Sequence, residues 1–162
     1  MKIRVIATGG TIDKVYFDAA STYDVGEPQV GPLFREANVT FDYIVESVLQ
    51  KDSLAMTDED RQLIRQRVQA APERHILITH GTDTMTQTAE QLADLGDKVI
   101  VFTGAMLPAR FRTSDALFNL GCAVGALQVL PAGVYIAMNG QIAPAHTVRK
   151  NRSLSRFERK DP

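Results

Sequence analysis

Short apolar segments that do not alternate with polar residues recur along the chain. They are rich in valine and isoleucine, which is typical of strands covered on both faces in a parallel sheet. These segments are residues 3–7, 76–79, 99–103 and 134–138. A fifth segment, residues 41–48, alternates less cleanly and is a further candidate strand. The pattern therefore predicts a sheet whose central strands are buried on both sides.

Between these segments, apolar residues recur at helical spacing. Thr57 followed by Asp60 is similar to a capping box and predicts the start of a helix that ends near Pro72. Two further helices are predicted to end at Gly96 and before Pro131. Strands that alternate with helices through short connections indicate an α/β fold. We therefore expect three layers, with a mostly parallel sheet and helices on both faces.

The chain contains no internal repeat and no linker, so residues 1–162 are expected to form a single domain. Residues 13–26 show no periodicity, and a long irregular loop in a compact domain is often a lid. We expect this loop to close over a ligand. Residues 149–162 are mostly charged and are expected to rest on the surface or to fray.

The composition is that of an ordinary globular domain. Of the 162 residues, 44% are hydrophobic and 23% are charged, which suffices for a buried core and argues against disorder. The net charge of −1 favours neither nucleic acid nor an anionic membrane, and we expect neither as a partner. The single cysteine, Cys122, excludes an internal disulfide. The first apolar stretch is too short for a signal peptide or a membrane span, so a cytoplasmic location is expected.

Each of the four predicted central strands runs into a turn that contains glycine. The turns are Thr-Gly-Gly-Thr at residues 8–11, His-Gly-Thr-Asp at 80–83, Gly-Ala-Met at 104–106 and Asn-Gly-Gln at 139–141. Open α/β sheets bind ligands beyond the carboxyl ends of their parallel strands, and glycine allows close approach of the backbone. We therefore expect the functional site where these turns meet.

Common motifs for nucleotide binding and hydrolysis are missing from these turns. The sequence contains neither the P-loop pattern nor G-x-G-x-x-G, and it lacks the G-x-S-x-G elbow. The three histidines form no metal-ligand spacing with Cys122, so we expect neither a metal ion nor a cofactor. What remains is a hydroxyl-rich pocket with one carboxylate, which suits nucleophilic attack by a threonine.

Taken singly, these residues also have structural explanations. Thr11 is suited to a helix cap or a turn, and Thr82 and Asp83 are favourable N-cap residues for the helix that follows. His80 is interpreted as a buried residue that bonds the backbone rather than as a catalytic base. Lys150 by itself would be a solvated surface residue.

Two of the turns carry a more specific pattern. Thr-Gly-Gly-Thr-Ile at residues 8–12, followed by His-Gly-Thr-Asp-Thr-Met at 80–85, resembles the two signature segments of the bacterial-type L-asparaginases. Three further segments resemble landmarks of that family, namely residues 51–53, 104–106 and 118–120. The resemblance extends to about Lys150 and implies the family's larger N-terminal catalytic domain, without its smaller C-terminal domain. In length, the chain is similar to the short-chain members.

The resemblance implies a role for each matching residue. Thr11 corresponds to the threonine proposed as nucleophile, and Tyr23 corresponds to the lid tyrosine that contacts it. Ser53 matches a residue that holds the α-carboxylate of the substrate. Thr82 and Asp83 match the second catalytic threonine and its aspartate, which also helps to hold the α-amino group. Which threonine attacks first stays open at this stage.

Lys150 resembles the lysine that completes this catalytic group. A neighbouring carboxylate favours the protonated form of a lysine, so beside Asp83 we expect Lys150 to be an orienting cation or an acid rather than a resting base. Backbone N–H groups around Gly10, Thr11 and Thr82 are the expected oxyanion donors. One departure from the family is Leu54, which stands where many members place a polar substrate contact.

The resemblance implies hydrolysis of L-asparagine to L-aspartate and ammonia through a threonine-linked intermediate, with weak or no action on glutamine. Two other functions stay open. One is a regulatory module that binds aspartate or asparagine, and the other is an amidotransferase subunit that supplies ammonia to a partner. In each case the ligand is a small molecule, and we expect a homo-oligomer.

Overall fold

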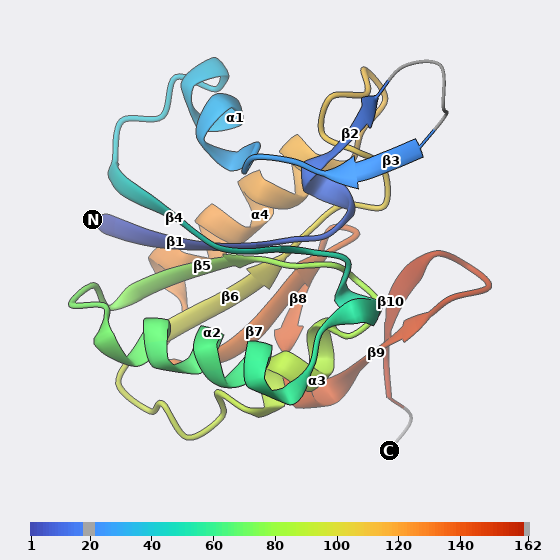
Figure 1. Ribbon diagram of the computed structural model, residues 1–162. Coiled ribbons are helices and arrows are strands. Elements are labelled where there is room, and N and C mark those ends of the chain that lie inside the picture. Colours follow the sequence, from blue (N-terminus) through green and yellow to red (C-terminus); the bar gives the residue numbers. More distant parts are fainter. Residues whose placement is uncertain (18–21, 161–162) are drawn as a thin grey trace.

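A six-stranded sheet forms the centre of the computed structural model, which describes residues 1–17 and 22–160 (Figure 1). Its strand order is β4-β1-β5-β6-β7-β8. The strands are β1 (Lys2–Gly9), β4 (Asp42–Lys51), β5 (His75–Thr79), β6 (Val99–Thr103), β7 (Gly133–Met138) and β8 (Gln141–Pro144). All neighbouring pairs are parallel except β7 and β8. The predicted strands, including the fifth candidate, are therefore present in one mostly parallel sheet.

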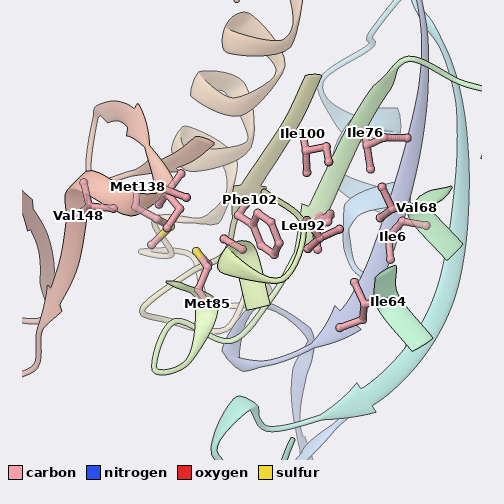
Figure 2. Packing of buried hydrophobic residues seen from close by; sticks show 14 of the residues in the cluster. Ile6, Ile64, Val68, Ile76, Met85, Leu92, Ile100, Phe102, Met138 and Val148 are labelled. Atoms are coloured by element: carbon pink, nitrogen blue, oxygen red, sulfur yellow. The ribbon is translucent and has the colours of Figure 1, made fainter. Parts of the chain in front are cut away.

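Helices cover both faces of this sheet, as Figure 1 shows. They are α1 (Val30–Glu36) and α4 (Ala116–Val129) on one face, and α2 (Asp58–Ala70) and α3 (Met85–Glu90) on the other. Successive residues of the central strands enter separate cores: Val5 packs with the α1 and α4 residues, whereas Ile6 packs with α2 and α3. Figure 2 shows this second core, in which Phe102 is among the largest fully buried side chains. The predicted three-layer α/β arrangement is confirmed.

The predicted start of α2 is confirmed in detail. The Thr57 hydroxyl accepts the N–H of Asp60 at 3.3 Å, and the Asp60 carboxylate accepts the N–H of Thr57 at 2.9 Å. The helix ends before Pro72. By contrast, α3 is shorter than predicted, because the chain beyond Glu90 continues in tight turns such as the one closed by Leu92 N–H on Ala89 O. No helix within the described residues is long and apolar enough to span a membrane.

The prediction of an irregular loop over residues 13–26 is wrong. Strands β2 (Lys14–Phe17) and β3 (Thr22–Val25) form an antiparallel hairpin that pairs Lys14 with Val25 and Tyr16 with Tyr23. Each short strand carries β-branched or aromatic residues, which favour extended structure. The hairpin rises from the carboxyl end of β1, beside the expected site (Figure 1).

The Asn139-Gly140 turn also differs from its predicted role. Both residues have positive φ angles, 54° and 74°, as in the two-residue turn that joins antiparallel strands. This turn reverses the chain from β7 into β8, so the sheet is mixed rather than wholly parallel. It therefore serves as a hairpin connection and not as a fourth ligand-binding turn after a parallel strand.

Residues 149–160 lie mostly at the surface, as predicted, but they are folded. Strands β9 (Val148–Asn151) and β10 (Arg156–Arg159) form a second hairpin. Phe157 of β10 is only 4% exposed and packs in the core with Val148 and Met138. Its N–H donates to the Asn139 side chain at 3.0 Å. One buried phenylalanine thus anchors a segment whose composition is otherwise polar.

Candidate active site

The turns after β1 and β5 touch each other through their backbones. A Cβ atom placed on Gly10 would lie 2.4 Å from the Gly81 nitrogen, and one on Gly81 would lie 2.6 Å from both Cβ and Oγ of Ser53. No side chain fits at either position, which explains the two glycines. Thr11 and Thr82 each follow one of these glycines. The structure therefore brings Thr11, Thr82 and Ser53 to one edge of the sheet.

Hydrogen bonds fix these segments in place. The Thr8 hydroxyl donates to Thr79 O at 2.9 Å, which joins β1 to the end of β5. The Gly10 N–H donates to Lys51 O at 2.9 Å, and the Thr84 hydroxyl donates to Ser53 O at the same distance. The Gly10 N–H is therefore engaged, contrary to its expected role as a free oxyanion donor.

Lys150 reaches this edge from β9. Its ammonium donates to Thr82 Oγ1 at 2.6 Å and to Asp83 Oδ1 at 2.9 Å, and all three side chains are at least partly buried. Thr82 and Asp83 therefore bond a distant lysine and do not cap α3, whose N-cap is Thr84. Two adjacent residues of the turn after β5 and one lysine of β9 therefore form one hydrogen-bonded group.

Ser53 presents an unusual hydroxyl. The residue is 2% exposed, and its Oγ has no hydrogen-bond partner among the described residues. A buried polar atom without a partner costs about 1–3 kcal/mol, and most such groups are satisfied in the functional state of a protein. The carboxylate of Asp52 caps the turn that holds Ser53 by accepting the Leu54 N–H at 3.0 Å.

Thr11 begins a short 3₁₀ turn (Thr11–Asp13) at the foot of the β2–β3 hairpin and is partly exposed. Within the described residues, the Thr11 and Thr82 N–H groups donate to no other backbone carbonyl. The backbone of Tyr23 pairs with Tyr16 in the hairpin, but the Tyr23 side chain lies outside the described part of the structure. Its expected contact with Thr11 stays a prediction.

His80 is a structural residue, as the sequence indicated. It is fully buried, its Nδ1 lies 2.7 Å from Gly81 O, and its Nε2 lies 2.8 Å from Thr88 Oγ1. Burial lowers the pKa of His80 to about 4, so the ring is neutral at physiological pH. A neutral ring bonded on both sides supports the Gly81 turn.

Asp13 is a buried residue near the site that the sequence did not indicate. It is 1% exposed, and its Oδ1 accepts the Gln29 N–H at 2.8 Å. Burial raises the pKa of Asp13 to about 7, the Gln29 hydrogen bond opposes that shift, and the negative charge of Glu27 adds to it. An aspartate in a turn is ordinarily solvated, so the burial of Asp13 could not be predicted from its neighbours in the chain.

Asp52 and Arg152 are two further charged residues at this edge. Although burial acts to raise it, the pKa of Asp52 is lowered by the Leu54 N–H, by Lys14 at 3.0 Å and by the charge of Lys150. Arg152 lies in the turn after β9, and its Nε is 3.2 Å from Asp83 Oδ1. No group of three or more potential metal ligands occurs among the described residues.

This fold and this arrangement of turns are those of the asparaginases. Residues 2–158 match the family model "Asparaginase, N-terminal", and the chain belongs to this family. It is 32% identical over 164 residues to the L-asparaginase of Thermococcus kodakarensis, covering 95% of this chain and 49% of that protein. A glutaminase-asparaginase of Pseudomonas fluorescens biotype A is also 32% identical over 164 residues, covering 90% of this chain and 44% of the relative.

A solved structure shows the same likeness. The thermostable L-asparaginase from Thermococcus kodakarensis superimposes with a TM-score of 0.86 at 28% identity. The match covers 98% of this chain and 51% of that one. The chain therefore spans about half the length of the relatives that it matches.

Proposed function

We propose that this chain carries the catalytic domain of an L-asparagine amidohydrolase, which converts L-asparagine and water to L-aspartate and ammonia. The observation that carries the proposal is the meeting of the Thr11 turn with the hydrogen-bonded group of Thr82, Asp83 and Lys150. Membership of the asparaginase family supports it. A cytoplasmic location and a homo-oligomeric state belong to the same proposal.

In the first step, Thr11 Oγ attacks the side-chain amide carbon of asparagine, forming a C–O bond. The N–H groups of Thr11 and Thr82 are suited to bind the resulting oxyanion, because neither is engaged by another described backbone carbonyl. One such donor contributes about 3 kcal/mol to the stabilisation of the transition state. The C–N bond then breaks, and ammonia leaves with a proton.

Thr82 and Lys150 form the proton relay. The Lys150 ammonium donates to Thr82 Oγ1, so the Thr82 hydroxyl keeps its own proton to donate. Its described acceptor is Met106 Sδ at 3.9 Å, a weak partner that a reacting atom can replace. The relay passes the proton that the Thr11 hydroxyl loses on attack to the departing ammonia. A water molecule then adds to the Thr11 ester, one of its protons passes through the relay to Thr11 Oγ1 as the ester C–O bond breaks, and aspartate is released.

Asp83 and Ser53 are proposed to hold the substrate. Only Oδ1 of Asp83 is bonded to described residues, so Oδ2 is suited to accept the α-ammonium group. The unpartnered Ser53 hydroxyl is suited to donate to the α-carboxylate. Gly10 acts through its backbone, which lets the two turns meet. Tyr23 is proposed to act from the β2–β3 hairpin as a lid residue over Thr11.

A coupled ammonia assay with asparagine and glutamine tests the proposal. We expect ammonia from asparagine, little from glutamine, and a loss of at least about 100-fold in kcat for Thr11→Ala, Thr82→Ala and Lys150→Met. Wild-type activity no greater than that of Thr11→Ala would overturn it. Stabilisation by aspartate without release of ammonia would instead indicate a binding module.

A further inference from the structure

Asp83 receives two cations on a single oxygen atom. Lys150 Nζ lies 2.9 Å from Asp83 Oδ1, and Arg152 Nε lies 3.2 Å from the same atom. Among the described residues, Oδ2 has no bonded partner. We propose that Arg152 is a positioning residue for this site, because its guanidinium holds the Asp83 carboxylate with Oδ2 turned to the substrate. This inference rests on the proposed function.

The first part of the role is geometric. Lys150 divides its ammonium between Thr82 and Asp83, so it alone restrains the carboxylate weakly. Arg152 adds an ion pair to Oδ1 from the turn between β9 and β10. Two cations beside one oxygen oppose rotation of the carboxylate and keep its other oxygen in place for an ammonium group.

The turn that carries Arg152 is itself held firmly. The Asn151 side-chain oxygen accepts the Ser153 hydroxyl at 2.7 Å and the Leu154 N–H at 3.2 Å. Its amide nitrogen donates to Glu158 Oε2 on β10 at 3.1 Å. Arg152 therefore starts from a fixed backbone position, although its side chain is 66% exposed.

The second part of the role is electrostatic. Lys150 is bonded to Asp83, and its charge also acts on Asp52, which is paired with Lys14 at 3.0 Å. These groups form a row of alternating sign across the site, and Arg152 is its outer cation. Without Arg152, Lys150 would be the one described cation paired with Asp83, and its ammonium is shared with Thr82.

Arg152→Gln removes the charge and the Nε donor, whereas Arg152→Lys keeps the charge alone. Arg156→Gln is the matched control, because Arg156 lies on the same hairpin, is similarly exposed and pairs with Glu158 at 2.8 Å. For Arg152→Gln we expect KM for asparagine to rise about three- to fivefold, the range for an exposed ion pair.

Arg152→Lys is expected to recover KM only in part, while Arg156→Gln leaves KM unchanged. KM does not depend on the folded fraction, so a loss of stability does not imitate this effect. If the wild type releases ammonia and Arg152→Gln matches Arg156→Gln in KM, the role of Arg152 is wrong and the proposed function stands. If the wild type neither releases ammonia nor binds aspartate, both are wrong.

Discussion

Asp13 is expected to make the stability of this protein depend on pH near neutrality. Its pKa is about 7 in the folded chain, against 3.8 for a free side chain, because burial and the negative charge of Glu27 disfavour the carboxylate more than the Gln29 hydrogen bond favours it. Between these two values the folded state holds a proton that the unfolded state has lost. The contribution of Asp13 to stability is therefore fully present below about pH 4 and is lost as the pH rises through about 7.

The magnitude follows from the same linkage. The free energy of unfolding falls by about 1.4 kcal/mol per pH unit across this window, or about 4 kcal/mol in total. Other groups titrate in the same range: burial lowers the pKa of His80 to about 4, and its contribution has the opposite sign. A comparison with one matched variant is therefore needed to isolate Asp13.

Asp13→Asn provides that comparison, because an amide has the shape of the protonated acid and still accepts the Gln29 N–H. Urea unfolding followed by circular dichroism at pH 5, 6, 7 and 8 gives the free energy of each protein. We expect the variant to gain about 1.4 kcal/mol on the wild type per pH unit up to about pH 7 and little beyond. A difference that stays constant from pH 5 to pH 8 would refute the reasoning.

Two other pairs of substitutions test the packing around the site. Gly10→Ala should lower the free energy of unfolding by at least about 2 kcal/mol and reduce activity, because φ is 85° and the added Cβ meets Gly81. Gly125→Ala, in open space on α4, should raise the free energy of unfolding by about 1 kcal/mol. Thermal unfolding measures both, and a shift of the same sign would contradict this account. Phe157→Ala should cost about 3–5 kcal/mol in urea unfolding, while Leu154→Ala, 54% exposed in the same hairpin, should change stability by less than about 0.5 kcal/mol. Equal losses would show that β10 is not anchored by its phenylalanine.

The central sheet could be predicted because its strands carry their own signal. Residues 99–102 are apolar at every position, and their side chains enter the two cores alternately. The connections were harder to predict. Asn139-Gly140 is a strong local hairpin signal, but its place after an apolar strand suggested a ligand-binding turn. Strand β10 is anchored by one buried residue, Phe157, whose neighbours in the sequence are charged.

Some residues of the candidate site could likewise be predicted from the sequence, and others could not. Thr11, Thr82 and Asp83 stand in contiguous segments that resemble family signatures, and the sequence identifies them without knowledge of the fold. The ion pair of Asp83 with Arg152 and the hydrogen bond from the Gln29 N–H to the Asp13 carboxylate depend on tertiary packing. Neither contact follows from spacing, because the burial and the direction of each side chain are decided by segments remote from it in the chain.

The candidate site is held from two opposite directions, and this arrangement links its chemistry to its stability. On one side, glycine backbones pack so closely that the Thr11 and Thr82 turns have little room to separate. On the other side, Lys150 arrives on a hairpin that is fastened to the core by Phe157. Loosening β10 would therefore withdraw Lys150 from Thr82 before the central sheet unfolds. Substitutions beneath this hairpin should consequently reduce turnover at temperatures where the sheet is still folded.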